Sequence, residues 1–539
     1  MEAVSTLIVI EAPGKIAALS RALKSIHLRA QVFATKGLLF SLPERSMGLN
    51  PDTLVPNEWV PIRQRSIDDL IVAARSATQV YVMTDADNEG ELIASQVRGI
   101  LVRNGFQGRI DRVRPTAITP EALKACLARP GELNRSAILQ AMARRAIDRG
   151  IGFILSNTRE NFNAVAGRVR AQLLGSIHAK PLTTHRLSGS QIADPGWRIN
   201  AEGTPAQAAS LNALCEAFHG KSPELFGYAK KKDWIVPPAP PAIGAEAILL
   251  IAGRLNIPVR EAEQLIQASY ESGRLSYPRT DSRRYSAETT ARLKTLGKSY
   301  GLRIRNDTPE WDSPPSAQQA HEALHVLEGD PCLGLSINDM RKEDAAHALL
   351  VRRALVPLCP DAEVSREAIP RSAIHAFLDK RKLPRVGAAI WKDTPESAGW
   401  MVLERGTINT ARVQDLPADQ SILRRIISDD IGRPSTAVIF VQAMLQNKLV
   451  DGGRLSKSGY ANFKFIESVA PSLTRKHNLD NFLGSHCDNA LEDAIKAGYG
   501  HLGLDPTELS QGAHERIHAQ DASDRAMDDG PAHQPRQVV

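Results

Sequence analysis

Two segments far apart in the chain share one pattern, which constrains the fold more than any other feature of the sequence. Residues Thr6–Ile10 are a short apolar run that ends in Glu11-Ala12-Pro13-Gly14-Lys15, and a helical pattern follows. Residues Gln79–Thr84 are a second such run, followed by Asp85-Ala86-Asp87-Asn88-Glu89-Gly90-Glu91 and another helical pattern. Each segment therefore predicts a strand, a turn and a helix. If the two strands are parallel neighbours, their carboxyl ends meet at the edge where α/β sheets bind ligands.

At that edge Asp85, Asp87 and Glu89 would face Glu11, with Lys15 at the start of a helix. Carboxylates this close repel one another, and a divalent cation relieves the repulsion. Magnesium (Mg2+) suits them because it is a hard ion that takes oxygen ligands and keeps waters and substrate phosphates as its other ligands. A solvated acidic loop remains the alternative for the triplet, and a helix-capping acid the alternative for Glu11.

A tyrosine with unusual neighbours lies in the segment Ser276-Tyr277-Pro278-Arg279-Thr280-Asp281-Ser282. A phenol is a poor nucleophile at neutral pH because its pKa is near ~10. The guanidinium of Arg279 can stabilise the phenolate and pair with a phosphate. Tyr277 is therefore a candidate nucleophile for a phosphodiester, although the segment is also rich in turn-forming residues.

Together these segments resemble those of the type IA DNA topoisomerases. The acidic segment is similar to the family's Toprim motif, Glu11 and Lys15 match its N-terminal Glu and Lys, and residues 276–282 are similar to its nucleophile motif. The resemblance covers roughly Thr6 to Phe463. Further matching positions, in the family's order, are Arg144 and Arg145, Arg168, Gln267 and Glu271, His321, and the run Gly432–Thr436 with Arg433, Ser435 and Thr436.

Three segments depart from the family's pattern. The segment Arg112–Thr119 lacks the aromatic residue and the acid that usually follow its arginine, and the familiar Gly-Arg-Val-Gln ends in Arg170. The proline-rich segment Pro237–Ala242 lacks the usual Phe. These differences indicate a divergent member of the family.

The resemblance implies a mechanism as well as a fold. Tyr277 would attack single-stranded or underwound DNA and form a 5′-phosphotyrosine, with Glu11 as general acid and Lys15 and Arg279 stabilising the phosphate. His321 would support the site through a hydrogen bond, and Asp85, Asp87 and Glu89 would hold magnesium. No nucleotide cofactor is expected, because the phosphotyrosine conserves the bond energy. The residues expected to contact DNA are Arg112, Arg144, Arg145, Arg168, Arg170, Gln267, Glu271, Arg433, Ser435 and Thr436.

The expected fold is a multi-domain α/β plus α architecture, in which a Toprim α/β domain, helical gate domains and a β-containing arch close into a ring. Strands returning to the arch are expected at residues 390–392 and 399–403. The expected boundaries are 1–132 for the Toprim domain with an inserted loop at 42–61, 133–181 and 416–505 for the helical gate, 182–245 and 353–415 for the arch, 246–352 for the helical domain of Tyr277, and 506–539 for a disordered tail.

Bulk properties agree with a DNA-binding protein without proving one. The chain has 539 residues, and its 67 Lys and Arg against 60 Asp and Glu give a net charge of +7, which suits a polyanionic partner. No apolar run approaches the ~20 residues of a membrane span. The five scattered cysteines indicate a reducing cytoplasm, and they exclude Cys-paired zinc ribbons.

Two other functions use parts of this pattern. Toprim-type nucleases and primases use an acidic cluster without a tyrosine, and the Tyr277 segment argues against them. A non-catalytic DNA-binding relative in a DNA-transfer complex would need none of Glu11, Lys15, the acidic triplet and Tyr277 together. The preference between relaxing supercoils and unlinking DNA circles stays open from the sequence.

Overall fold

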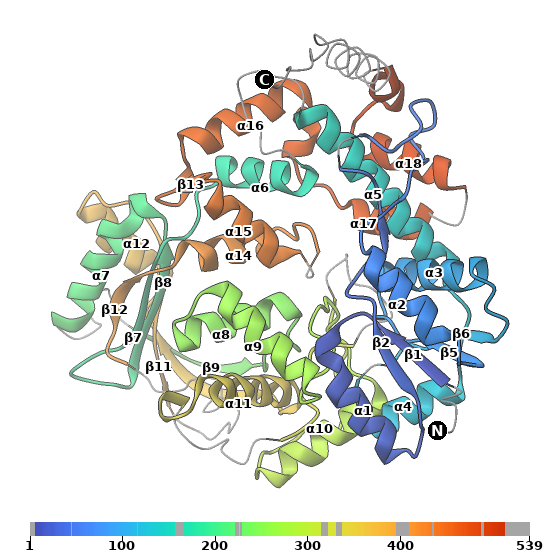
Figure 1. The fold of residues 1–539 in the computed structure, drawn as a ribbon. Coiled ribbons are helices and arrows are strands. Elements are labelled where there is room, and N and C mark those ends of the chain that lie inside the picture. Colours follow the sequence, from blue (N-terminus) through green and yellow to red (C-terminus); the bar gives the residue numbers. More distant parts are fainter. Residues whose placement is uncertain are drawn as a thin grey trace, which may run out of the picture.

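The structure is a computed structural model that describes residues 6–44, 46–115, 117–156, 167–220, 226, 229–313, 322–329, 337–394, 409–433, 436–486 and 490–511. Its elements are arranged around a ring, with the chain's first α/β unit on one side and a β-sheet with two helices on the opposite side (Figure 1). Helical units connect the two sides above and below. This mixed α/β and α architecture confirms the predicted fold class.

The N-terminal unit is built on a four-stranded parallel sheet with the order β2-β1-β5-β6. Side chains alternate between two cores, so that Leu7 and Val9 pack beneath α2 and α3 while Ile8 and Ile10 pack beneath α1 and α4. The strands and helices are β1 (Thr6–Ile10), α1 (Ile16–Ser25), β2 (Gln31–Ala34), α2 (Gln64–Ala74), β5 (Gln79–Val82), α3 (Asn88–Arg103), β6 (Arg109–Arg112) and α4 (Pro120–Ala128).

The predicted insertion at residues 42–61 connects this unit to the helices above it. It begins directly after β3 (Phe40–Ser41) and ends with β4 (Val60–Pro61), which pairs with β3. Its Leu42, Met47 and Leu49 are buried in the same core as α5. The insertion therefore attaches the N-terminal unit to its neighbour through apolar contacts.

One large hydrophobic core includes helices from both the upper and the lower part of the ring. The upper helices are α5 (Arg135–Ser156), α6 (Arg168–Ala179), α14 (Ala418–Ser428), α15 (Ala437–Gln446), α16 (Lys457–Val469), α17 (Leu479–His486) and α18 (Leu491–His501), with a hairpin of β13 (Val450–Asp451) and β14 (Arg454–Leu455). The lower helices, called here the tyrosine unit, are α8 (Gly244–Leu255), α9 (Val259–Glu271), α10 (Ala287–Ser299) and α11 (Lys342–Leu355).

The opposite side of the ring, called here the arch, is a six-stranded antiparallel sheet with the order β12-β7-β8-β11-β10-β9. Helices α7 (Ala208–Gly220) and α12 (Arg371–Lys380) pack on one of its faces. Its strands are β7 (His185–Ser190), β8 (Trp197–Gly203), β9 (Lys230–Val236), β10 (Ala362–Ala368), β11 (Gly387–Thr394) and β12 (Arg412–Asp415). The returning strand predicted at residues 390–392 is part of β11, whereas the one predicted at 399–403 lies outside the described residues.

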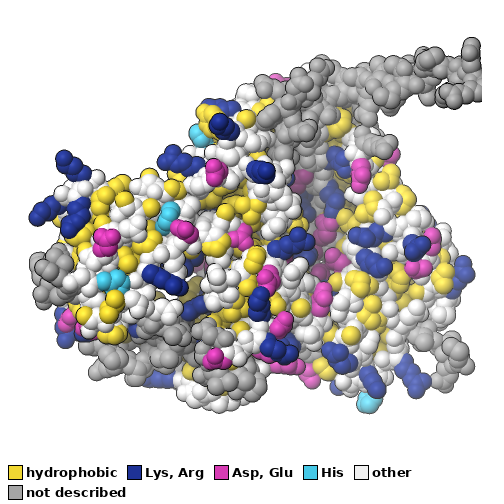
Figure 2. Space-filling model, turned by 60° about the vertical axis from the view of Figure 1, so that its left-hand side comes forward, with side chains coloured by type: hydrophobic (Ala, Val, Ile, Leu, Met, Phe, Trp, Pro, Cys, Tyr) yellow, Lys and Arg dark blue, Asp and Glu magenta, His cyan; other side chains and the backbone are white. Residues whose placement is uncertain are grey.

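Three further expectations concern the C-terminal residues, membrane-spanning helices and the charge of the surface. Disorder was predicted from residue 506, but residues 506–511 are helical, and residues 512–539 lie outside the described part. Within the described residues, no helix is both long enough and apolar enough to cross a membrane. Lys and Arg side chains on the face drawn in Figure 2 are scattered among acidic and apolar ones, so the modest positive charge forms no single patch there.

Candidate active site

The first half of the candidate site is the carboxyl edge of the N-terminal sheet. Strands β1 and β5 are parallel neighbours, and the Met83 amide, directly after β5, donates to the Val9 carbonyl near the end of β1 at 2.7 Å. Glu11 and Asp85 follow these two ends. The predicted meeting of the two acidic segments is therefore confirmed.

The carboxyl group of Glu11 lies in a strongly perturbing environment. Burial, followed by the negative charges of Asp85 and Asp87, raises its pKa to about 8, against the opposing charges of Lys15 and Arg279. Glu11 is thus mostly protonated at neutral pH. A carboxyl group in this state can donate a proton.

Lys15 is buried at the end of a short 3₁₀ turn, Pro13–Lys15, and its ammonium group binds Asp85. The same ammonium lies 4.7 Å from the centre of the Tyr270 ring. Burial opposes its charge, but Tyr270 and Asp85 together raise the pKa of Lys15. The site therefore holds a permanently charged cation beside Glu11.

Asp87 begins helix α3 and also reaches the tyrosine. Its Oδ1 accepts the Gly90 amide at 2.7 Å as the helix N-cap, and its Oδ2 accepts the Tyr277 hydroxyl at 2.8 Å. Gly90 is required here, because a Cβ atom would overlap the backbone carbonyl of Asp85. The N-cap bond fixes Asp87 toward the tyrosine unit.

Glu89 points elsewhere. Its carboxylate pairs with Arg145, and Arg144 lies 3.4 Å away, both from helix α5. Among the described residues, no group of three or more His, Cys, Asp or Glu side chains is gathered closely enough to hold a metal ion. The crowded oxygens of Asp85 and Asp87 beside Glu11 nevertheless have the chemistry that magnesium prefers. They fit this ion better than Glu89 does in this arrangement.

Tyr277 reaches this edge from the tyrosine unit, 190 residues away in sequence from Asp87. Its loop is fixed by Ser276, whose amide donates to the His325 carbonyl at 2.9 Å and whose Oγ accepts the His325 amide at 3.0 Å. The Tyr277 ring meets Tyr270 edge-on, with the ring centres 5.7 Å apart. Burial and the charges of Asp87 and Asp85 raise the pKa of Tyr277, so its hydroxyl is a proton donor in this state.

The two halves of the site meet through further contacts. Arg279 is exposed, and its positive charge opposes the rise in the pKa of both Glu11 and Tyr277. Gln267 donates to Glu271 at 3.0 Å. The Glu271 carboxylate in turn lies against Gly14, at a distance that leaves no room for a Cβ atom. A cavity of about 50 Å³ lies between Lys15, Asp85, Tyr270 and Tyr277.

The arginines expected to contact DNA form a cluster that already contains carboxylates. Arg168 is buried and donates to Asp148 at 2.8 Å, and Arg433 lies 2.7 Å from Asp480. Despite its burial, Asp480 has a pKa of about 2, because Arg433, Arg144 and Arg168 surround it. Asp480 was missed from the sequence, since an acid on a polar helix is usually solvated.

Other expected DNA contacts are placed differently. Arg170 is half-buried, and burial lowers its pKa. The hydroxyl of Thr436 donates to the Arg433 carbonyl at 3.2 Å and thus shapes the turn before α15. His321 and Ser435 lie outside the described residues, so their expected roles stay predictions.

Arg112 has a supporting place in the structure. Its buried guanidinium donates to Glu91 at 2.8 Å and to main-chain carbonyls that include those of Thr84 and Asp85. Glu91 also accepts Arg114 at 2.7 Å and the Asn134 amide at 2.9 Å. Arg112 therefore fixes the end of β5, and its guanidinium is buried away from the surface that DNA could reach in this structure. Glu91, the last acid of the 85–91 segment, was not predicted to have this role.

Comparisons with known proteins agree with both halves of the site. A model described as Toprim domain matches residues 6–115, and a model described as DNA topoisomerase matches residues 237–393. The chain is 29% identical over 287 residues to DNA topoisomerase 1 of Vibrio cholerae, a match that covers 49% of this chain and 32% of that protein. It is 25% identical over 487 residues to DNA topoisomerase 1 of Aquifex aeolicus, covering 83% and 87%.

The fold has a solved counterpart. The structure of full-length topoisomerase I from Thermotoga maritima superimposes with a TM-score of 0.65 at 17% sequence identity, over 93% of this chain and 90% of that one. The likeness thus extends around the whole ring. The match to the Vibrio cholerae protein, by contrast, spans about a third of that relative.

Proposed function

This chain belongs to the type IA DNA topoisomerase family, and from that premise we propose that it cleaves one DNA strand, passes DNA through the break and reseals it without ATP. The substrate is single-stranded or underwound DNA. Relaxation of negative supercoils and unlinking of DNA circles use the same chemistry, so both belong to the proposal. We place the protein in the cytoplasm with the DNA on which it acts.

One observation carries the proposal: the Tyr277 hydroxyl lies 2.8 Å from Asp87 at an edge that also holds Glu11 and Lys15. A binding protein has no need of a phenol at a cluster of titratable groups. A Toprim nuclease or primase has no need of the tyrosine unit. A tyrosine nucleophile uses both the cluster of titratable groups and the tyrosine unit.

The cleavage step follows from these groups. The Tyr277 oxygen attacks phosphorus, the P–O3′ bond breaks, and the 5′ end stays on the tyrosine as a phosphodiester. Asp87 is placed to receive the phenol proton. Glu11, protonated at neutral pH, gives its proton to the leaving 3′-oxygen. Religation is the same exchange in reverse, with Glu11 as the base.

Cations stabilise the charge that builds on the phosphate. Lys15 is held beside the site by Asp85, and the exposed Arg279 is placed to pair with a phosphate oxygen. Beyond the scissile bond, the arginines of the upper helices hold the strand through its phosphates. Arg168 would share its N–H donors between DNA and Asp148, and Arg433 would share its donors between DNA and Asp480.

Magnesium is part of the proposal through Asp85 and Asp87, which would hold it near Glu11. When bound, Mg2+ offsets the negative charge of the carboxylates and the DNA, which helps to realign the broken ends. Glu89 was expected to be a third ligand. Its pairing with Arg145 and Arg144 supports a different role, in which it holds helix α5 against the N-terminal unit.

The deciding experiment is relaxation of a negatively supercoiled plasmid with magnesium and without ATP, for the native chain and Tyr277→Phe. Tyr460→Phe is the matched control, since Tyr460 is an exposed tyrosine of α16. Relaxation should be lost only in Tyr277→Phe, and a 3′-end-labelled oligonucleotide should remain attached to the native protein through its 5′ end. Release of free ends by Tyr277→Phe would support the nuclease function, and binding without cleavage by either chain would support a non-catalytic relative.

A further inference from the structure

The arch sheet has one face without the two helices that cover the other. Helices α7 and α12 pack on one side of the sheet, on the outside of the ring (Figure 1). At one corner of the opposite face, Ala362 and Val364 are covered by a small apolar cluster with Val356 and Cys359. The rest of this face, called here the open face, carries polar and aromatic side chains. Strand pairing identifies its charged and aromatic residues as Arg186, Arg198, Glu202, Lys230, Lys232, Trp234, Arg366, Trp391, Asp393 and Arg412, and places the uncharged Ser188, Asn200 and Gln414 on the same face.

Positive charge dominates the open face. Six of those residues are Lys or Arg, and only Glu202 and Asp393 are acidic. Glu202 accepts hydrogen bonds from two arginines, Arg186 at 2.8 Å and Arg424 of α14 at 3.0 Å, so its own charge is more than balanced. The face therefore complements a polyanion.

Two tryptophans give the open face a second property. Trp391 lies beneath Arg366, whose guanidinium carbon is 5.6 Å from the ring centre, and Trp234 lies beneath Lys232 at 5.4 Å. Trp234 is 45% exposed although it belongs to a strand. Trp234 on β9 and Trp391 on β11 lie two strands apart and are offset by four residues along the strands. This geometry separates the two residues by roughly 16 Å. A few nucleotides of an extended strand cross such a distance.

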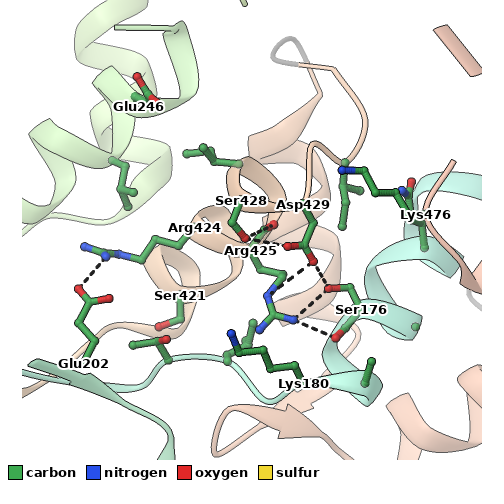
Figure 3. Close-up of a pocket in the computed structure, with 18 of the residues that line it drawn as sticks. Ser176, Lys180, Glu202, Glu246, Ser421, Arg424, Arg425, Ser428, Asp429 and Lys476 are labelled. Carbon is green, nitrogen blue, oxygen red and sulfur yellow. Dashed lines mark hydrogen bonds and ion pairs between the residues drawn. The ribbon is translucent and has the colours of Figure 1, made fainter. Parts of the chain in front are cut away.

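The open face continues into a large cavity. This cavity, of about 1110 Å³, is bounded by α6, α8, α14 and the strands β7 and β8. Figure 3 shows Arg424 reaching toward Glu202 from α14, while Lys180 and Lys476 lie on the far side of the cavity. Seven basic and three acidic residues line it: Lys180, Arg186, Arg254, Arg424, Arg425, Arg475 and Lys476 against Glu202, Glu246 and Asp429.

We propose that the open face binds single-stranded DNA, at a site separate from the strand held at Tyr277. Cations follow the backbone and tryptophans stack on unpaired bases, which is the combination that single-strand binding uses. Duplex DNA offers phosphates but no free base faces to the tryptophans. A protein partner fits less well, because lysines are depleted from the centres of protein interfaces. This inference goes beyond the proposed cleavage and resealing chemistry, which uses only the site at Tyr277.

Strand β9 supplies a matched pair of variants, because neighbouring residues of a strand point to opposite faces. Lys232 and Trp234 lie on the open face, whereas Lys231 and Ile235 lie on the other. The test variant is Lys232→Ala with Trp234→Ala, and the control is Lys231→Ala with Ile235→Ala. Both remove one lysine and one large exposed apolar side chain from the same edge strand.

Two measurements on the full chain test the proposal. Affinity for a fluorescent oligothymidylate should fall about tenfold in the test variant, because each stacked base contributes on that scale, and less than twofold in the control. An oligonucleotide carrying 5-iodouracil should cross-link to Trp234 or Trp391 of the native protein. Equal weakening in both variants, or cross-links confined to the surroundings of Tyr277, would overturn the proposal.

Covalent attachment of a short labelled oligonucleotide to Tyr277 separates this proposal from the proposed function. If the native chain does not form the attachment, the proposed function fails, whatever the open face binds. If attachment is intact in all variants while the test variant binds oligothymidylate like the native chain, only the open-face site is refuted.

Discussion

Glu11 gives the sharpest test of the proposed proton transfer. Burial and two neighbouring carboxylates raise its pKa from 4.5 to about 8. With that pKa, roughly ten Glu11 side chains are protonated for each ionised one at pH 7, and the ratio is reversed at pH 9. If the protonated form serves the leaving 3′-oxygen, the cleavage rate should fall about tenfold between pH 7 and pH 9. An ordinary glutamate that donated this proton would already be mostly ionised at pH 7, and the rate would fall about a hundredfold between pH 7 and pH 9, with no plateau near neutral pH.

The assay is single-turnover formation of the covalent complex on an end-labelled single-stranded oligonucleotide, measured from pH 6 to pH 10. Glu11→Gln should cleave about 10²–10⁴-fold more slowly, and its rate should no longer decline between pH 7 and pH 9. Asp85→Asn removes a negative charge that raises the Glu11 pKa. Its decline should therefore begin at a lower pH than that of the native protein.

Three results would contradict this reasoning. A flat profile for the native protein would mean that Glu11 does not titrate in this range or does not donate the proton. A Glu11→Gln variant with an unchanged decline would assign the titration to another group. A shift to higher pH in Asp85→Asn would contradict the assignment of the charges that raise the Glu11 pKa.

Three further predictions concern stability and docking. Glu91→Gln leaves Arg112 buried without its carboxylate, so it should cost about 3 kcal/mol or more, seen as a lower thermal midpoint. Gly14→Ala should reduce covalent complex formation because its Cβ would overlap the Glu271 carboxylate, and adding Glu271→Ala should restore part of the loss. The folded state binds a proton at Glu11 more tightly than the unfolded state, so the free energy of unfolding falls as the pH rises from 4.5 to 8. Glu11→Gln should therefore be more stable than the native chain at pH 7, by on the order of 2–3 kcal/mol. Chemical denaturation should show this gain and its disappearance below pH 4.5.

The sequence predicts the acidic edge of the site well, for a local reason. In an apolar run followed by Glu11 or Asp85, strand, turn and helix are set by neighbouring residues. Parallel pairing then brings the two carboxyl ends together without further information. Asp87 is also local, because it caps the helix that it begins.

What the sequence does not predict depends on how separate helices are placed. Glu89 belongs to the same motif as Asp87, yet helix α5 supplies Arg145 and Arg144 and turns it away from the other carboxylates. Asp480 of α17 is near Arg433 only because the fold brings α17 beside the segment that follows α14. No periodicity along either helix encodes such a pairing. The open face of the arch is equally hidden, since β9 and β10 come from different passes of the chain.

The hydrophobic cores indicate which interface at the active site parts after cleavage, when the break in the DNA strand must open. The N-terminal sheet has its own two cores, and among the described residues neither includes a side chain of the tyrosine unit. The contacts between them are mainly polar, such as Tyr277 with Asp87 and the Arg21 guanidinium 3.5 Å from the Ser272 carbonyl. On the side of α5, by contrast, Leu42 and Met47 of the insertion are buried in the large helical core. Water can replace polar contacts at little net cost, whereas parting the insertion from α5 would expose apolar surface at about 25 cal/mol per Å². The break should therefore open between Tyr277 and the acidic edge, with the 5′ end carried away on the tyrosine unit and the 3′ end left with the N-terminal unit.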